Sequence, residues 1–148
     1  MAVTSAEREL LAQAPFFAGL NSAQIERLAA HAQVRSYPKD TRIYAIVDPV
    51  DDFYVLADGM VRFTLGLGKR ETSAGDFMRR GDVFGWAALV EGYSRRIATA
   101  YCLTACSVVA FAGADLHSLM ESDHSLGYGI MKRLTVLLTS ELTSFAAG

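Results

Sequence analysis

The sequence has little of the features that point to a secreted, membrane or nucleic-acid-binding protein. Its longest apolar runs fall short of the roughly 18 residues that a membrane span needs. Glu7, Arg8 and Glu9 stand in the first segment, which excludes the apolar core of a signal peptide. Lysines and arginines form no stripe, and the formal net charge is −2 at pH 7. We therefore expect a cytoplasmic protein that contacts no membrane and, by this chain alone, no nucleic acid.

Cysteine is also scarce, with Cys102 and Cys106 as the two examples in the chain. Their spacing would place both side chains on one face of an extended strand. Residues four apart in a strand are separated by about 13 Å, which is beyond the reach of a disulfide. The sequence therefore predicts two buried free thiols.

A sufficient apolar content is present, at 51% of 148 residues, for one domain with a single core. The hydrophobic period changes twice along the chain. It is helical in residues 1–33, alternating in residues 34–112 and helical again in residues 113–148. We interpret the chain as one mainly β domain with flanking helices, in which a jelly-roll-like β-roll of about eight antiparallel strands lies between N-terminal and C-terminal helices.

The N-terminal part contains two predicted helices. Thr4 or Ser5 caps the first, which runs to about residue 13 and is stopped by Pro15. Asn21 and Gln24 have the spacing of a capping box, and the apolar residues that follow favour a second helix over 22–32.

The middle part consists of short apolar runs separated by turn residues, and each run predicts a strand. Asp58-Gly59 is the strongest hairpin signal among the turns. The predicted strands are residues 34–37, 42–47, 53–57, 60–65, 72–79, 97–103 and 107–112.

The stretch from Gly81 to Thr99 is the strongest candidate for a binding site. A tight turn at Gly81-Asp82 leads to Gly85 and then to one short helical turn. The first N–H groups of such a turn lack intrahelical partners and favour an anion such as phosphate. Arg95 and Arg96 follow closely enough to fold over the turn, and either could supply a guanidinium.

These residues resemble a known family, the cyclic nucleotide-binding domain of the CRP/FNR type. Its phosphate-binding cassette has the form Phe-Gly-Glu-x-Ala-Leu, followed after a loop by Arg-x-Ala-Thr. Here the cassette reads Phe84 to Leu89 and Arg96 to Thr99, and the opening Pro15-Phe16-Phe17 also matches the family. The resemblance implies a regulatory domain that binds cAMP, cGMP or another phosphate-bearing ligand. It places eight residues around that ligand: Phe84, Gly85, Trp86, Ala87, Ala88, Arg95, Arg96 and Ile97.

The chain departs from the family pattern at three positions. Trp86 stands where the family has the glutamate that binds the ribose, and an indole cannot accept those hydrogen bonds. The indole either fills the ribose space from inside or stacks on another anionic ligand. Asp40 and Val47 stand where the family has glycines, and we expect the loop at Val47 to have changed shape. The alternative hypothesis is a degenerate pocket in a domain that serves for dimerisation or protein interaction.

Catalytic and metal sites are not predicted. His31, His117 and His124 lie on or beside helices, away from the interior of the roll where a metal would need them. Acidic residues in loops form no catalytic constellation, so we expect no enzyme activity.

The last predicted helices cover residues 115–122 and 125–145. The resemblance implies that they move on ligand binding, and we expect no DNA-binding helix-turn-helix after them. Gly127 and Gly129 weaken the start of the second helix by roughly 1 kcal/mol each and predict fraying there. The apolar stripe is wider than one face needs, so we expect a homodimer through this helix. The stripe comprises Leu126, Ile130, Leu134, Leu137, Leu138, Leu142 and Phe145.

Overall fold

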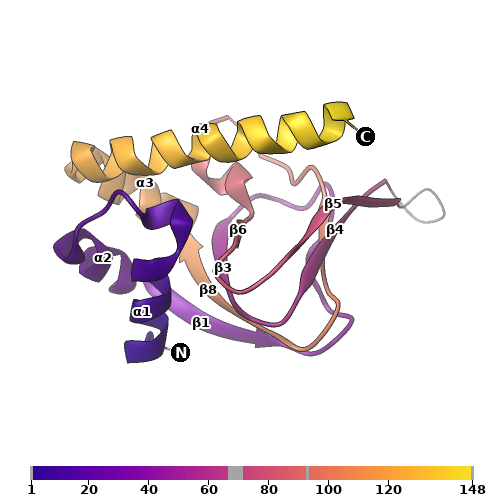
Figure 1. Cartoon of the computed structure of the whole chain (residues 1–148), viewed down its shortest axis with the longest axis horizontal. Coiled ribbons are helices and arrows are strands. Elements are labelled where there is room, and N and C mark those ends of the chain that lie inside the picture. The colour runs from indigo at the N-terminus through magenta and orange to yellow at the C-terminus, as the bar shows by residue number, and fades with distance from the viewer. Residues whose placement is uncertain (1, 67–71, 93, 148) are drawn as a thin grey trace.

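The computed structural model describes residues 2–66, 72–92 and 94–147, and the side chains of 2–66, 77–92 and 94–140. Two antiparallel four-stranded sheets face each other and form a β-roll (Figure 1). Helices α1 and α2 lie against one side of the roll, and α4 crosses one end of it (Figure 1). The predicted jelly-roll-like architecture with flanking helices is confirmed. The predicted Leu142 and Phe145 contacts lie outside the described side chains.

The strands are ordered so that neighbours along the chain are often in different sheets. The first sheet has the order β1-β8-β3-β6 and the second has the order β2-β7-β4-β5. The first sheet comprises β1 (Ala32–Tyr37), β8 (Cys106–Ala112), β3 (Asp52–Asp58) and β6 (Val83–Phe84). The second comprises β2 (Arg42–Tyr44), β7 (Thr99–Cys102), β4 (Val61–Leu65) and β5 (Thr72–Met78).

The N-terminal elements are α1 (Ser5–Gln13), a 3₁₀ turn η1 (Pro15–Phe17) and α2 (Ser22–Ala29). The capping box is confirmed, because the Gln24 amide donates to Asn21 Oδ1 at 2.9 Å and the Asn21 amide donates to Gln24 Oε1 at 2.9 Å. Helix α2 ends three residues before the predicted position, since the chain enters β1 at Ala32.

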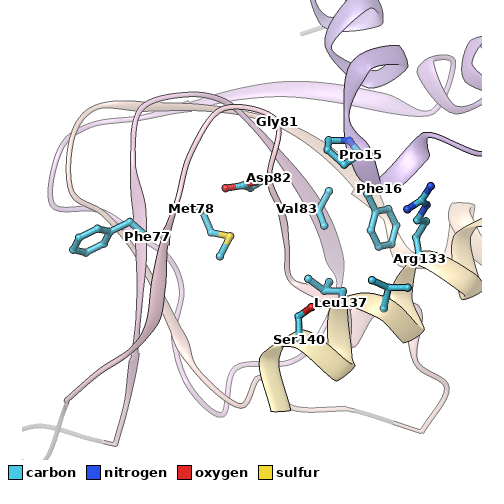
Figure 2. A pocket seen from close by; sticks show the side chains of 11 residues that line it. Pro15, Phe16, Phe77, Met78, Gly81, Asp82, Val83, Arg133, Leu137 and Ser140 are labelled. Carbon is cyan, nitrogen blue, oxygen red and sulfur yellow. The ribbon is translucent and has the colours of Figure 1, made fainter. Parts of the chain in front are cut away.

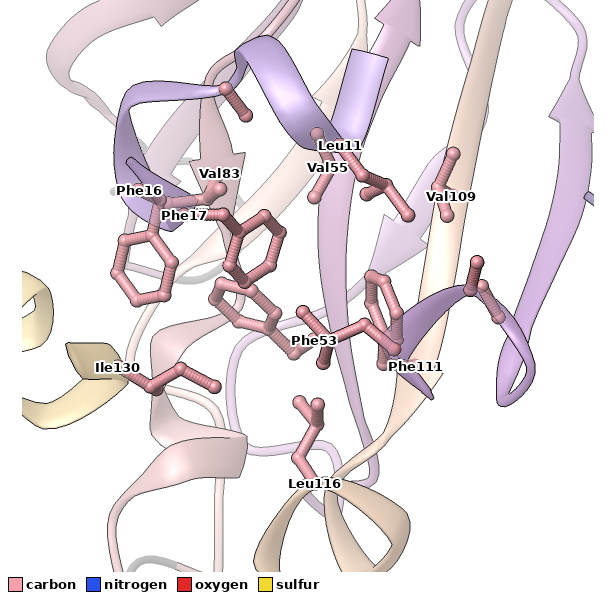
Figure 3. Close-up of a cluster of buried hydrophobic side chains, with 14 of the residues drawn as sticks. Leu11, Phe16, Phe17, Phe53, Val55, Val83, Val109, Phe111, Leu116 and Ile130 are labelled. Carbon is pink, nitrogen blue, oxygen red and sulfur yellow. The ribbon is translucent and has the colours of Figure 1, made fainter. Parts of the chain in front are cut away.

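The strands β3, β6 and β8 of the first sheet are buried on both faces, and side-chain alternation along them creates two cores. Phe53 and Val55 of β3 point to the helix-side core, together with Phe111 of β8 and residues of the helices (Figure 3). Tyr54 and Leu56 point to the roll interior. A run such as residues 53–57 is therefore apolar at every position, because both of its faces are covered.

The prediction of a hairpin at Asp58-Gly59 is wrong. Strand β3 pairs with β6 and β8, whereas β4 pairs with β5 and β7, so this turn carries the chain from one sheet to the other. Gly59 has a φ of 94°, and a Cβ at this position would lie 2.5 Å from the Ala105 carbonyl oxygen. The positive φ that suggested a hairpin is real, but the turn is a corner of the roll that packs on the 103–105 turn.

The cysteines flank that second turn. Cys102 ends β7 and Cys106 begins β8, so the prediction that both lie on one strand is wrong, although both thiols are free and buried as expected. Burial raises the pKa of Cys102 to about 12, with a further contribution from the Cys106 thiol. A thiol with so high a pKa holds very little thiolate at neutral pH and is a poor nucleophile.

The loop at Val47 has a left-handed backbone conformation, which a β-branched residue disfavours. Val47 has a φ of 66° and Asp40 a φ of 69°, both in the left-handed region. Hydrogen bonds hold the loop, because the Val47 amide donates to the Arg96 carbonyl oxygen at 2.9 Å and the Arg96 amide donates to the Asp48 carbonyl oxygen at 2.8 Å. These bonds hold the left-handed backbone at Val47, and a change in the loop's shape relative to the family stays a prediction.

Val47→Gly is expected to stabilise the protein by about 0.5–1 kcal/mol. Left-handed geometry costs a residue with a Cβ about 1–2 kcal/mol, and glycine removes this cost. The greater loss of chain entropy when glycine folds offsets only part of the stabilisation. Little packing is lost, since Val47 is 58% exposed. Urea unfolding measures the change, and Val47→Ala, which keeps the Cβ, should show no comparable gain. A loss of stability in Val47→Gly would contradict the strain.

The C-terminal helices are α3 (Gly113–Ser122) and α4 (His124–Ala147). The described α4 is continuous through Gly127 and Gly129, and hinging or fraying at this end stays a prediction. A Cβ on Gly127 would lie 3.1 Å from the Met120 Cβ and carbonyl oxygen, and one on Gly129 would lie 3.1 Å from Leu20 Cδ2. Both glycines therefore allow close packing at the start of α4. No helix in the described ranges is long and apolar enough to cross a membrane.

Asp123→Asn is expected to reduce stability at neutral pH and to have a smaller effect in acid. Asp123 Oδ1 accepts a hydrogen bond from the Leu126 amide at 3.1 Å, and Oδ2 accepts from Gln24 Nε2 and Arg27 Nη1, both at 3.2 Å. The Leu126 amide, followed by Gln24 and Arg27, holds the pKa of Asp123 below its usual value.

A lowered folded-state pKa gives stability that is present above the unfolded pKa and is lost as pH falls through the folded pKa. The difference between wild type and Asp123→Asn should therefore narrow below about pH 4. Urea unfolding across this range measures it, with Glu121→Gln, an exposed α3 carboxylate, as control. A difference that stays constant with pH would refute the role of the charge.

Candidate functional site

The predicted cassette forms a sharp turn at the end of β6. Gly85 has a φ of 76° and a ψ of 31°, and the 3₁₀ turn η3 (Trp86–Leu89) follows it. A Cβ on Gly85 would lie 3.0 Å from Tyr54 Cδ2 and 3.1 Å from both Arg96 Nη1 and the Asp52 carbonyl oxygen. Glycine is therefore needed here both for its backbone angles and for the close approach of the arginine.

The turn uses some of the amides that were expected to be available to a ligand. The Ala88 amide donates to the Gly85 carbonyl oxygen at 3.2 Å, so this amide closes the turn. Ala87 and Ala88 are also buried, at 5% and 7% exposure. The positive end of the turn is thus smaller than the sequence suggested, and the nearby guanidinium becomes the dominant charge.

Arg96 is the buried cation of the site. It lies in the loop before β7, which begins at Thr99 and not at residue 97 as predicted, and the residue is 3% exposed. Its Nη1 donates to the Gly85 carbonyl oxygen at 3.1 Å, and its Nη2 donates to the Asp52 carbonyl oxygen at 2.5 Å. These bonds join the cassette to β3 and fix the guanidinium at the mouth of the turn.

Aromatic rings form the wall beside this guanidinium. The Arg96 Cζ lies 4.2 Å from the centroid of the Tyr44 ring, a cation–π distance. Tyr54 stacks on Phe84 with centroids 5.0 Å apart, and Tyr44 stacks on Tyr54 at 6.0 Å. Burial, and then the charge of Asp52, raises the pKa of Tyr54, so its hydroxyl stays protonated.

The charge of Arg96 is incompletely compensated. The nearest carboxylate oxygen, Oδ1 of Asp51, is 3.5 Å from Nη2 and belongs to a side chain that is 74% exposed. The carboxylate of Asp52 is engaged by Arg35, whose Nη1 donates to Oδ2 at 2.8 Å. Within the described residues, the buried Arg96 Nε has no hydrogen-bond partner. The guanidinium therefore has one buried donor without a partner in the described residues and only a distant, solvated counter-ion.

The structure places the side chains of the two arginines differently. Arg95 is exposed, and its Nη1 donates to the Val47 carbonyl oxygen at 3.4 Å on the outside of the loop. Ile97 is 49% exposed, so it does not line the roll interior. Of the three residues predicted from this segment, Arg96 faces the cassette and the other two face outward.

The combination of a β-roll, a cassette after β6 and an inward arginine agrees with the comparisons. The family model for the cyclic nucleotide-binding domain matches residues 34–123, which is more than half of the chain. The chain belongs to the cyclic nucleotide-binding domain family. A search of curated protein sequences finds no match.

Three solved structures illustrate the range of related folds. A protein assigned as cyclic nucleotide-binding from Geobacter metallireducens is 23% identical, with a TM-score of 0.78 over 95% of this chain and 99% of its own. The c-di-GMP-responsive regulator CLP of Xanthomonas campestris is 23% identical, with a TM-score of 0.75 over 86% and 62%. The cAMP-bound regulatory domain of Toxoplasma gondii PKA is 18% identical, with a TM-score of 0.72 over 86% and 48%.

Trp86, at the family's glutamate position, packs on the helix side of the cassette. Its indole is half-buried against the helix-side core, which includes Ala88 and Leu89 of the same turn. This packing supports a structural role for the indole, and whether it fills the space of a ribose stays a prediction. The indole stabilises the turn against the helices and supplies no acceptor for a ribose.

Helix α3 contacts the cassette at Ala88 and the neighbouring residue Asp51, and the sequence did not predict either contact. His117 Nε2 lies 3.2 Å from the Ala88 carbonyl oxygen, and the Gly113 amide donates to the Asp51 carbonyl oxygen at 2.8 Å. A Cβ on Gly113 would lie 2.9 Å from the Ala88 carbonyl oxygen, so glycine lets α3 approach the turn. A change in η3 would therefore be felt at the start of α3.

Residues outside the motif complete the site, and their sequence signals are weak. Tyr44 of β2 and Asp52 of β3 contact Arg96 from strands of different sheets, and only the packing of the two sheets brings them together. No group of three or more metal-ligating side chains is found among the described residues.

Proposed function

We propose that this protein is a regulatory, ligand-sensing domain that binds a small phosphate-bearing anion, such as a cyclic nucleotide, through Arg96 and the Gly85–Leu89 turn. In this proposal the domain has no catalytic activity of its own and acts in the cytoplasm. The observation that carries the proposal is the buried guanidinium of Arg96, whose Nε donor has no partner among the described residues.

The physical argument is the cost of an uncompensated charge. Removing a cation from water is unfavourable by several kcal/mol unless a close counter-ion and hydrogen bonds offset it. Carbonyl oxygens of Gly85 and Asp52 offset part of this cost, but the distance to the closest carboxylate, that of Asp51, is long and this carboxylate is exposed to solvent. A phosphate oxygen at Nε would supply both the missing acceptor and the missing charge.

The ligand would differ from those of relatives that hold the ribose with a glutamate. The indole of Trp86 offers no carboxylate, so affinity would come from the phosphate and from the aromatic wall of Tyr44, Tyr54 and Phe84. The absence of the glutamate would reduce the affinity of a ligand with two phosphates, or of one without a free ribose hydroxyl, less than the affinity of cAMP or cGMP. Binding would draw Arg96 from the Gly85 carbonyl and, through Ala88 and His117, shift α3 and α4.

Calorimetry with cAMP, cGMP and cyclic dinucleotides tests the proposal. We expect saturable binding of at least one of these ligands to wild type, and at least about a tenfold weaker affinity for Arg96→Ala. Arg95→Ala is the matched control, because it removes the neighbouring exposed guanidinium, and its affinity should equal that of wild type. Equal affinity of Arg96→Ala and wild type would exclude Arg96 as the ligand-binding residue.

The second candidate function is dimerisation through α4. Tyr128 and Val136 are 69% and 53% exposed, and they lie about two turns apart on this helix. Large apolar side chains exposed on one helix favour packing against a second copy. If the pocket bound no ligand, dimerisation through α4 would be the main function of the domain.

Sedimentation at micromolar concentration tests this second candidate. We expect a dimer that is weakened by Tyr128→Glu, which places a charge at the more exposed of these two side chains. Ala23→Glu, which adds the same charge to an exposed position of α2, should leave the dimer intact. A wild-type monomer under these conditions would exclude dimerisation.

A further inference from the structure

A cavity lies outside the roll, between α4 and the edge of the first sheet. It has a volume of 420 Å³ and is bordered by η1, β5, the Gly81-Asp82 turn, β6 and α4. Figure 2 shows Met78 and Asp82 on one side of this space, Phe16 and Arg133 on the other, and Leu137 and Ser140 on α4. Its volume is within the range of small-molecule sites, about 300–1,000 Å³.

Most of the lining is aliphatic or aromatic, and part of it is not covered by the protein itself. Phe16, Met78, Val83 and Leu137 supply the apolar surface. Phe77 and Val136 also line the cavity, and they are 49% and 53% exposed, among the most exposed large apolar side chains that the structure describes. An apolar ligand in the cavity would remove this surface from water.

The two charged side chains that line the cavity differ in their hydrogen bonding to the protein. Asp82 Oδ2 accepts a hydrogen bond from the Arg79 amide at 2.9 Å, so its carboxylate is part of the turn. Arg133 is half-buried on α4 and has no ion pair or hydrogen bond with the part of the chain that the structure describes. The cavity thus combines an apolar body with one unused cation at its rim.

We propose that this cavity binds an amphipathic monoanion with an aliphatic chain, of the fatty-acid type, with its carboxylate on Arg133. The chain lies along Met78, Val83 and Leu137, and the carboxylate pairs with the guanidinium at the end bordered by Phe16. This site is separate from Arg96 and does not depend on the proposed anion site in the roll.

Titration calorimetry with decanoate at submicellar concentration tests the proposal. Wild type is expected to bind one decanoate with a saturable isotherm, and Arg133→Gln to bind about tenfold more weakly. Ser140→Trp fills the cavity from its rim and should abolish binding. Lys132→Gln removes the adjacent exposed cation of α4 and should bind like wild type. Far-ultraviolet circular dichroism confirms that each variant is folded.

Two further probes test the charge, and one variant separates this site from the site in the roll. Decanol and decyltrimethylammonium should bind more weakly than decanoate, and Arg96→Ala should bind decanoate like wild type. The proposal is overturned if decanoate shows no saturable binding, if Arg133→Gln binds it as tightly as wild type, or if the cationic probe binds as well as the anion. None of these outcomes bears on cyclic nucleotide binding at Arg96.

Discussion

Gly59→Ala is expected to lower the free energy of unfolding by about 4 kcal/mol. Gly59 has a φ of 94°, and left-handed geometry costs a residue with a Cβ about 1–2 kcal/mol. The added methyl group would also lie 2.5 Å from the Ala105 carbonyl oxygen and 2.8 Å from Cys106 Sγ. The carbonyl belongs to the backbone of the opposing turn, so relief requires the corner between the two sheets to open, at a further cost of about 1–3 kcal/mol.

Two other glycines separate the two contributions. Gly81 has a φ of 90° with nothing described within 4 Å of its Cβ position, so Gly81→Ala should show the conformational cost alone. Gly19 has neither a positive φ nor a close neighbour in the described chain, and Gly19→Ala should change stability by less than about 1 kcal/mol. Urea unfolding of the three variants should show a much larger loss of stability in Gly59→Ala than in Gly81→Ala, and a larger loss in Gly81→Ala than in Gly19→Ala. Equal effects at Gly59 and Gly81 would contradict the packing of the corner.

Arg96→Met is expected to abolish most ligand binding while changing the stability of the ligand-free protein little. Methionine has a long apolar side chain, so it fills similar space without a buried charge. A buried cation without a close carboxylate contributes little net stability, and its replacement by an apolar side chain is often neutral or favourable. The loss of the contacts to Tyr44 and to the two carbonyl oxygens acts in the opposite direction. Charge-assisted bonds to the ligand contribute about 1.5–3 kcal/mol, so affinity should fall by about 10- to 150-fold.

Urea unfolding with and without cAMP or a cyclic dinucleotide measures both quantities, because a ligand of the folded state raises stability in proportion to its affinity. Arg95→Met is the control for the loss of a guanidinium in the same loop. A strongly destabilised Arg96→Met that still gained stability from ligand would mean that Arg96 is a structural residue.

The sequence contained the cassette but could not orient its arginines. Phe84 to Leu89 and Arg96 to Thr99 carry the family pattern in consecutive residues, so the family fold followed from a local sequence pattern and a candidate site could be assigned to it. Whether Arg95 or Arg96 faces inward depends on the loop that joins Val47 and Asp48 to the arginine segment by backbone hydrogen bonds. Contacts between segments nearly 50 residues apart leave no periodic signal in either segment.

The errors made from the sequence share a physical cause. Asp58-Gly59 was interpreted as a hairpin and Cys102 to Cys106 as one strand, because local patterns do not show when a chain leaves one sheet for the other. At Val47, hydrogen bonds within the loop and to Arg96 hold a backbone that the side chain disfavours, and the sequence does not show these bonds. Gly127 allows α3 and α4 to pack closely, a role that helix propensity does not show.

The most direct test of the anion site is the nuclear magnetic resonance signal of the Arg96 Nε–H group, assigned by its loss in Arg96→Lys. This donor is buried and lacks a partner among the described residues, so a phosphate ligand should give it a hydrogen bond. We predict that titration with cAMP or a cyclic dinucleotide shifts this signal saturably, with no shift of the Arg95 Nε–H signal. An Arg96 signal that stays unchanged while calorimetry shows the ligand to be bound would contradict the account.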